Sequence, residues 1–374
     1  MTVLITILSI LVTIYLLNIL RFIIGLMQNE VKPSPTYINR SISVIVAVKN
    51  GEENIARLLE GLLSQKYNGD MEFIIVDDQS TDNTQKIIEK YSQENSSIRY
   101  VSSSTGNNIL NHKKKALDAG IQASKYEHLL FTDIDCIIQS SWIQSMSKKF
   151  DLEADYIVGF TYVENRVTIL NKFQRVDLLM LLFAAYASIL LKRPWASSGQ
   201  NQAYTKKLYY KLNGFETLAA YLQGDDTLFL QHARQSKAKI VFNNDPESYV
   251  ISRSEKTWKS LLLQRARWSG DANVMWKFNI PFYITAFSTF ITNLIIIIFL
   301  LLCLARYSLT IEYMNIFILL ISLKIILEYI MYTIGNIKFK NQTYIIDFLV
   351  WSIIIAPYTC LMGIMSFFNF KWRS

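Results

Sequence analysis

The stretch SVIVAVKNGEENIARLLEGLLSQKY, residues 43–67, decides the fold. Its first part, SVIVAV (43–48), predicts a buried strand, and EENIARLLEGLLSQ (52–65) has apolar residues at the spacing of an amphipathic helix. Further strand-like and helix-like segments alternate after it, at 72–76, 82–91, 98–102, 113–123 and 128–132. This alternation predicts an α/β fold with a parallel sheet and crossover helices, as in the nucleotide-binding half of a doubly wound domain.

The chain of 374 residues is unusually apolar, with 51% hydrophobic and only 18% charged residues. The excess is gathered in blocks, because residues 2–20, 281–305 and 348–370 carry no charge at all. About 20 apolar residues are enough to cross a bilayer. We therefore exclude a fully soluble protein. The expected organisation is a transmembrane anchor, a globular domain and a membrane region with about three spanning or re-entrant helices, at residues 1–28, 40–275 and 276–374.

The N-terminal block has neither a basic start nor a small-residue cleavage site, which favours a retained anchor over a removed signal peptide. A polar linker with Lys32, Pro33 and Pro35 follows it. The uncharged run 178–191 is shorter than a span, which predicts a buried or interfacial helix.

Three apolar segments follow the globular domain, at about 281–305, 313–335 and 346–369. The middle one contains Lys324 and Glu328, one helical turn apart. Charged groups inside a span either line a polar path or lock helices together, and the sequence leaves both alternatives open.

Charge and cysteine content indicate partners and compartment. The 38 basic and 30 acidic residues leave a net charge of +8, which fits an anionic membrane face and a phosphate-bearing ligand, and we expect no nucleic-acid partner. The three cysteines form no disulfide or zinc pattern, which favours a reducing compartment. Basic flanks predict that the globular domain is cytoplasmic. With three spans after the domain, Lys371 and Arg373 would lie outside against this rule, so the last block is re-entrant, broken at Pro357, or the count of spans is off by one.

Acidic residues follow two of the predicted strands, where doubly wound sheets bind their ligands. Asp77 and Asp78 end the strand at 72–76, and could bind a base or ribose or simply cap the next helix. Asp133 and Asp135 follow the strand at 128–132, with alternate residues able to point the same way. Paired carboxylates of this kind can hold Mg²⁺ or Mn²⁺, although such pairs are also common in turns.

Three further groups have alternative interpretations. The run Lys113–Lys115 opens a helix and could face a diphosphate or solvent. Asp225 and Asp226 precede an apolar helix, which suits either an N-cap pair or a general base. Gln264, Arg267 and Trp268 share one helix face and could grip a diphosphate and stack on a sugar, or belong to a basic membrane helix.

Taken in order, these segments resemble the membrane-bound inverting glycosyltransferases of family 2, the group that includes cellulose, chitin and hyaluronan synthases and ceramide glucosyltransferase. The resemblance covers about residues 41–270 and rests on seven motifs: SVIVAVKNGEENIARLLEGLLSQKY, IIVDDQSTDNT, KKKALDAGI, FTDIDC, GQNQAY, GDDTLFL and QRARW. It implies a GT-A domain inserted between N- and C-terminal transmembrane helices. The protein would be multi-pass in the inner or plasma membrane, with a cytoplasmic catalytic domain.

The resemblance also implies roles for single residues. Those that would bind the nucleotide sugar are Ala47, Asn50, Glu52, Asp78, which would contact uracil, Lys113 and Asp133. Asp135, together with Asp133, would bind a divalent cation, Mg²⁺ or Mn²⁺. Asp226 would be the catalytic base, beside Asp225, which stands where Glu is usual. The residues that would close over the diphosphate and the acceptor are Gln264, Arg267 and Trp268.

Two positions depart from the family pattern. Gly51 follows Asn50 where Glu is common, so the acidic contact is lost or passes to Glu52, and Lys49 replaces the commoner Tyr or Arg. The implied reaction moves a hexosyl or N-acetylhexosaminyl group from a UDP-sugar to a lipid or growing glycan beside the membrane lipids. Two alternatives are a processive synthase that exports its polymer, and a receptor or scaffold that binds nucleotide without turnover.

Overall fold

The computed structural model describes residues 2–30, 38–305, 311–342 and 344–368, so the predicted linker at 32–35 and the tail with Lys371 and Arg373 lie outside the described residues. The chain forms two compact units. An α/β unit contains Glu30–Glu164 and Lys192–Arg253, and a helical unit contains Met1–Asn29, Asn165–Leu191 and Ser254–Phe370. The predicted limits at 28, 40 and 275 stay a prediction.

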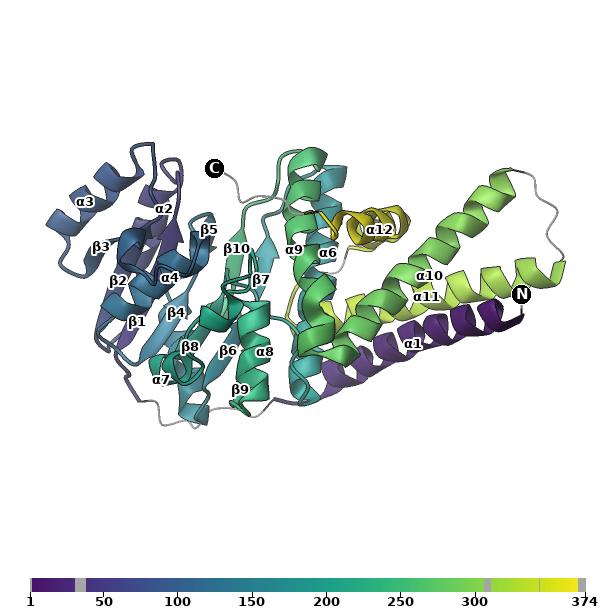
Figure 1. The fold of residues 1–374 in the computed structure, drawn as a ribbon, viewed down its shortest axis with the longest axis horizontal. Helices are drawn as coiled ribbons and strands as arrows, with labels where there is room; N and C mark the ends of the chain where they lie inside the picture. Colours follow the sequence, from purple (N-terminus) through teal and green to yellow (C-terminus); the bar gives the residue numbers. More distant parts are fainter. Residues whose placement is uncertain (1, 31–37, 306–310, 343, 369–374) are drawn as a thin grey trace. The chain divides into compact units, whose positions relative to one another are not determined.

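A seven-stranded sheet forms the centre of the α/β unit (Figure 1). Its strands, in spatial order, are β3 (Ile98–Ser102), β2 (Met71–Asp77), β1 (Ile42–Val48), β4 (His128–Phe131), β8 (Gln202–Thr205), β6 (Tyr156–Gly159) and β9 (Ile240–Asn243). The pairs between β1 and its neighbours β2 and β4, and between β2 and β3, are parallel, which confirms the predicted direction of these strands.

No strands beyond β4 were predicted from the sequence. Strand β8 runs antiparallel to both β4 and β6, so the sheet is mixed. A second sheet of three short strands, β5 (Cys136–Ile138), β10 (Val250–Ser252) and β7 (Thr161–Val163), was not predicted. With three residues each, these strands are too short to show a periodic pattern.

The predicted helices of the α/β unit are present. They are α2 (Ile55–Leu63), α3 (Thr84–Glu94) and α4 (His112–Ala123). The unit also contains α5 (Trp142–Lys148), α7 (Lys206–Lys211) and α8 (Thr227–Gln235). Helix α2 buries Ile55, Leu58, Leu59 and Leu62, the apolar face that its sequence spacing predicts. These helices and strands surround one hydrophobic core.

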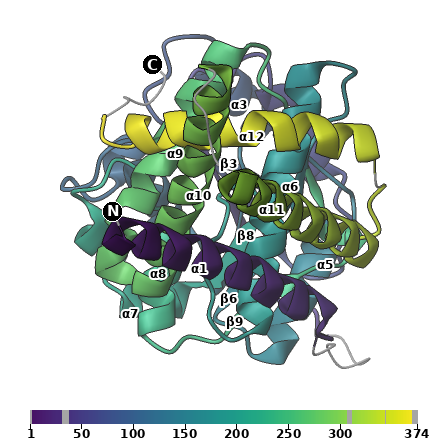
Figure 2. The same cartoon turned by 90° about the vertical axis from the view of Figure 1, so that its right-hand side faces the viewer.

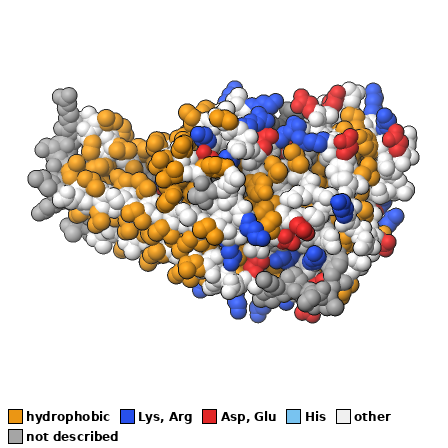
Figure 3. All heavy atoms as spheres, turned by 180° about the vertical axis from the view of Figure 1, so that it is seen from behind, with side chains coloured by type: hydrophobic (Ala, Val, Ile, Leu, Met, Phe, Trp, Pro, Cys, Tyr) orange, Lys and Arg blue, Asp and Glu red, His pale blue; other side chains and the backbone are white. Residues whose placement is uncertain are grey.

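The helical unit consists of α1 (Thr2–Met27), α6 (Ile169–Leu190), α9 (Trp258–Phe278), α10 (Ile280–Leu304), α11 (Ile311–Lys338) and α12 (Ile345–Met365). Five of its helices, all but α9, are long and apolar enough to cross a membrane within the described residues. Helix α1 packs against α6, α10 and α11, and α12 packs across α6 and α10 (Figure 2). Hydrophobic side chains gather over this unit in Figure 3.

Two predictions about these helices can be checked. The run 178–191 belongs to α6, which is longer than the uncharged run and is 78% buried over its apolar window, in agreement with a buried helix. The suggested break at Pro357 is wrong, because α12 continues through Pro357.

The charged pair inside α11, Lys324 and Glu328, is buried and forms an ion pair. Lys324 Nζ lies 2.8 Å from Glu328 Oε2, and both side chains are 4% exposed. Tyr15 of α1 donates a hydrogen bond to the other oxygen of Glu328. These contacts join α1 to α11, which favours a lock between helices over a polar path.

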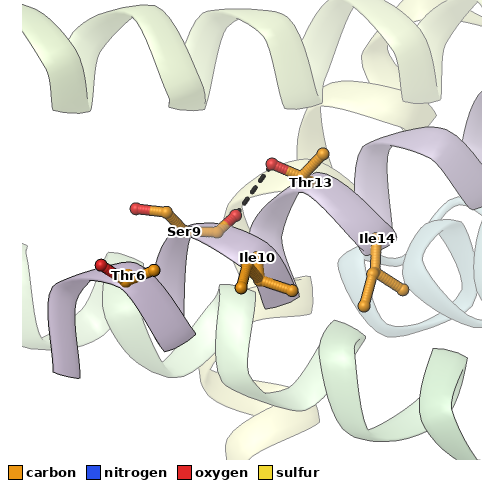
Figure 4. Close-up of a pocket in the computed structure, with 5 residues that line it drawn as sticks. All are labelled: Thr6, Ser9, Ile10, Thr13 and Ile14. Atoms are coloured by element: carbon orange, nitrogen blue, oxygen red, sulfur yellow. Dashed lines mark hydrogen bonds between the residues drawn. The ribbon is translucent and has the colours of Figure 1, made fainter. Parts of the chain in front are cut away.

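A pocket of about 380 Å³ lies along α1, lined by Thr6, Ser9, Ile10, Thr13 and Ile14 (Figure 4). The Thr13 hydroxyl donates to the Ser9 carbonyl at 2.8 Å, a bond within the helix itself. Among the described residues, all of the lining comes from one helix, so they do not form the convergent polar set from several elements that is typical of a ligand site.

Candidate functional site

Four charged side chains from three distant segments meet in the α/β unit. Lys113, in the first turn of α4, donates a hydrogen bond to Asp133 Oδ1 at 2.8 Å. Its Nζ also lies 3.1 Å from Asp225 Oδ2. Asp226 follows Asp225 and opens α8. We call Lys113, Asp133, Asp225 and Asp226 the acidic cluster.

Lys113 stays charged in this cluster. Burial disfavours its ammonium group, but the carboxylates of Asp133 and Asp225 outweigh that effect and raise the pKa of Lys113 well above its ordinary value. The lysine therefore neutralises part of the negative charge that the three aspartates bring together.

Asp226 takes one of the two roles that its sequence position left open, the N-cap, while the role of general base stays a prediction. It is the N-cap of α8, since Oδ1 accepts a hydrogen bond from the Thr227 N–H, and Oδ2 accepts one from the Gly199 N–H at 3.1 Å. Burial and the charge of Asp225 raise its pKa to about 6, against the opposing effect of Lys113 and the two N–H groups. A carboxylate so tuned suits a general base near neutral pH.

The GQNQ segment, residues 199–202, packs directly against the cluster. A Cβ atom on Gly199 would lie 2.9 Å from Lys113 Nζ and 3.2 Å from Asp225 Oδ2, so only glycine fits without a shift. Gln202 Nε2 donates to the Asp225 carbonyl at 3.3 Å, and Thr132 Oγ1 donates to the Gln200 carbonyl at 3.0 Å. The sequence analysis gave this motif no role, although a glycine followed by three amides was a usable signal for backbone positioning.

The loops after β1 and β2 are bound to each other. Asn50 has a positive φ of 49° and accepts a hydrogen bond from the Thr81 N–H at 2.8 Å. The Glu52 carboxylate accepts bonds from the N–H and the side-chain amide of Asn83, both at 3.1 Å. Glu52 thus holds the loop after β2. Asp78 is fixed at its backbone, where its N–H donates to the Val48 carbonyl at 2.7 Å.

Ala47 lies near the end of β1, opposite Val76 of β2, and is partly exposed. Its position follows from the register of the parallel strands, in which each β1 residue pairs with its partner on β2. No side-chain contact places Ala47 with the acidic cluster.

Asp133 and Asp135 lie in the turn between β4 and β5. No group of three or more His, Cys, Asp or Glu residues forms a metal cage within the described part of the chain. Mg²⁺, however, is commonly bound by one or two carboxylates together with waters and substrate phosphates. The donor chemistry of Asp133 and Asp135 fits a cation that binds together with a phosphate ligand.

Gln264, Arg267 and Trp268 lie on α9, in the helical unit. Gln264 donates to Glu255 Oε1 at 3.2 Å. Arg265, which lies between Gln264 and Arg267 in the sequence, has a side chain that is 4% exposed, and its guanidinium group lies 3.1 Å from Asp177 Oδ2. The Cζ atom of Arg265 lies 4.0 Å from the centroid of the Trp268 ring. One face of Trp268 is therefore already covered by Arg265, a residue whose burial the sequence analysis missed.

Comparisons with known proteins identify similar sequences. Residues 43–213 match the model of the glycosyl transferase family 2. The probable glycosyltransferase YdaM of Bacillus subtilis (strain 168) is 25% identical over 257 residues, which are 65% of this chain and 58% of that protein. The poly-beta-1,6-N-acetyl-D-glucosamine synthase of Staphylococcus epidermidis is 29% identical over 164 residues, 42% of this chain and 36% of the synthase.

Among solved structures, the mannosyltransferase PcManGT from Pyrobaculum calidifontis, in complex with GDP-Man and Mn²⁺, has a TM-score of 0.65 at 16% identity. The match covers 96% of this chain and 98% of that chain. At this identity the likeness concerns the fold alone.

The mixed sheet of the α/β unit belongs to the same fold as this mannosyltransferase, the GT-A fold that the sequence analysis expected. The match of residues 43–213 to the glycosyl transferase family 2, together with relatives named as glycosyltransferases, confirms the predicted resemblance to that family and the enzyme class. The chain covers 58% of the length of the first of these relatives and 36% of the second.

Proposed function

We propose that this glycosyltransferase moves a hexosyl or N-acetylhexosaminyl group from a UDP-sugar to a lipid or glycan acceptor at a membrane, with inversion at the anomeric carbon. The observation that carries the proposal is the acidic cluster, in which Lys113 lies 2.8 Å from Asp133 and 3.1 Å from Asp225, beside Asp226. The five apolar helices support the membrane location.

Asp226 is the proposed base. Its carboxylate takes the proton of the acceptor hydroxyl while the hydroxyl oxygen forms a bond to the anomeric carbon. The bond from that carbon to the diphosphate oxygen breaks, and its electron pair leaves with the nucleoside diphosphate. Asp225 lies 3.1 Å from Lys113 Nζ and so holds that ammonium group beside the proposed base.

The other residues bind and orient. Lys113 brings a permanent positive charge to the place where the diphosphate would lie, and Asp78 offers a carboxylate for the base. Asp133 and Asp135 would hold Mg²⁺ or Mn²⁺, which would supply positive charge to the leaving diphosphate. Gln264, Arg267 and Trp268 are proposed to contact the diphosphate and the acceptor.

A second candidate is a processive synthase that builds an exported polysaccharide. The name of the Staphylococcus epidermidis relative, a poly-beta-1,6-N-acetyl-D-glucosamine synthase, favours it. The buried lock between Lys324, Glu328 and Tyr15 argues against a polar path through α11, and therefore against this candidate.

The test supplies membranes containing the protein with radiolabelled UDP-glucose, UDP-N-acetylglucosamine and GDP-mannose, each with and without EDTA. We expect label from one UDP-sugar to enter an organic-solvent extract, with EDTA abolishing transfer and added Mg²⁺ or Mn²⁺ restoring it. Label in a high-molecular-weight fraction would favour the synthase. Transfer from GDP-mannose alone, or full activity in EDTA, would contradict the proposed donor or the cation.

A further inference from the structure

Lys114, the neighbour of Lys113, is buried at 2% exposure instead of facing solvent. Its ammonium group donates hydrogen bonds to three backbone carbonyls of one segment: Leu218 at 2.7 Å, Gln223 at 2.9 Å, and Tyr221. An ammonium group carries three N–H donors, so each carbonyl can receive one. Burial removes this charge from water, which is costly unless hydrogen bonds offset it, and three main-chain oxygens supply such bonds here.

The segment that Lys114 binds has little regular structure of its own. It lies between a short turn of 3₁₀ helix, Glu216–Leu218, and helix α8. It ends at Gly224, whose φ of +117° is a backbone conformation that other residues rarely adopt. Because three carbonyls of this segment converge on one ammonium group, Lys114 constrains the path of residues 218–223.

The same helix turn also holds the side chains that follow. Lys113 lies 3.1 Å from Asp225, while Lys114 binds the backbone immediately before Gly224 and Asp225. The first turn of α4 therefore contacts both the main chain and a carboxylate of the segment that carries the base.

We propose that Lys114 is a positioning residue, which holds residues 218–223 so that Asp225 and Asp226 lie against Lys113 and Gly199. The inference rests on the proposed function, because it gives Asp226 the role of base. Without the ammonium group, the segment would loosen and the base would lose its alignment, and a misplacement of about 1 Å can cost roughly 10²-fold in rate.

The test uses the full chain in detergent with Lys114→Met, which removes the charge, and Lys114→Gln, which keeps two N–H donors. The matched control is Lys206→Met, since Lys206 Nζ donates to the Ser124 carbonyl at 2.6 Å, at the other end of α4. Hydrogen exchange is measured in peptides covering 216–227, and kcat and the KM for the donor are measured in parallel.

For Lys114→Met we expect exchange over 216–227 to rise by about tenfold or more, kcat to fall about 10²-fold and KM to change less than about threefold. Lys114→Gln should show intermediate effects, and Lys206→Met neither. Unchanged exchange over 216–227, or raised exchange with an unchanged kcat, would overturn the proposal. If the wild-type protein transfers no sugar, the proposed function fails, and the exchange comparison still decides whether Lys114 holds the segment.

Discussion

At the residue scale, two neighbouring aspartates have different surroundings. Asp225 lies 3.1 Å from the ammonium group of Lys113, whereas the Asp226 carboxylate accepts hydrogen bonds from the main-chain N–H groups of Gly199 and Thr227. Burial and the charge of Asp225 raise the pKa of Asp226. Pairs of carboxylates whose surroundings separate their proton affinities are typical of acid–base sites.

This difference predicts the pH dependence of transfer. Asp226 acts as a carboxylate, and its pKa is raised to about 6 by burial and Asp225, so the active form is lost as the pH falls through that value. We expect kcat/KM to drop roughly tenfold per pH unit below about 6 and to level off above it. A profile of kcat/KM measured from pH 4.5 to 8 checks this expectation. A fall in kcat/KM that begins only near pH 4 would contradict the assignment of Asp226 as the base.

The sequence predicted the acidic cluster residues but not the contacts that hold them. Asp133, Asp225 and Asp226 stand at the ends or starts of predicted elements, where general rules on sheets and caps draw attention to them. The burial of Lys114 and Arg265 could not be predicted. Lys114 binds main-chain carbonyls of residues 218–223, and Arg265 pairs with the carboxylate of Asp177, and both partners are far away in the chain. A run of lysines ordinarily indicates a solvent-exposed face.

At the scale of elements, the fit of α4 against the sheet has a measurable consequence. A Cβ atom on Gly120 would lie 2.5 Å from Ile45 Cγ2 and 2.9 Å from Val76 Cγ2. Gly120→Ala should therefore destabilise the protein by about 1–2 kcal/mol, since overpacking costs about 1–3 kcal/mol and helix propensity returns up to about 1. Gly270→Ala, on α9, is the control.

No atom lies within 4 Å of a Cβ built on Gly270, so Gly270→Ala should leave stability unchanged or raise it by up to about 1 kcal/mol. Thermal unfolding in detergent compares the two variants with the wild type. An unfolding temperature for Gly120→Ala at or above that of Gly270→Ala would contradict the close packing of α4 on β1 and β2.

Helices and strands whose sequences show a clear hydrophobic period or a buried apolar run were predicted correctly, whereas the shortest strands were not predicted. Strands β1 to β4 and helices α2 to α4 follow from buried apolar runs and helical spacing. Strand β8 (QAYT) has too few residues to reveal its direction, and its antiparallel pairing depends on where the chain returns after α6. The three-residue strands β5, β7 and β10 exist only through their mutual pairing.

At the scale of the whole molecule, the helical unit buries charge within apolar helices. Lys324→Met would leave Glu328 buried without its cation, and breaking such a pair costs about 3–5 kcal/mol. Replacing both residues by Met should cost less than the single change, because no uncompensated charge remains. Unfolding in detergent measures both variants. Equal stability of Lys324→Met and wild type would contradict the lock and favour a polar path.

The division into units was the least predictable feature. Helix α6 interrupts the α/β segment in sequence, yet it belongs to the helical unit with α1, α11 and α12. Its apolar run and its flanking Asp177 and Lys192 are equally compatible with a core helix. Its place depends on partners more than a hundred residues away, which no local pattern can indicate.

The central claim is that Asp226 is the base of a sugar transfer in the acidic cluster. The most direct measurement compares wild type with Asp226→Asn, which keeps the size of the side chain and an oxygen for the N-cap bond, in transfer rate and in nucleotide affinity. We predict that transfer falls by at least about 10³-fold while UDP affinity changes less than about threefold. Retained turnover in Asp226→Asn would contradict the account.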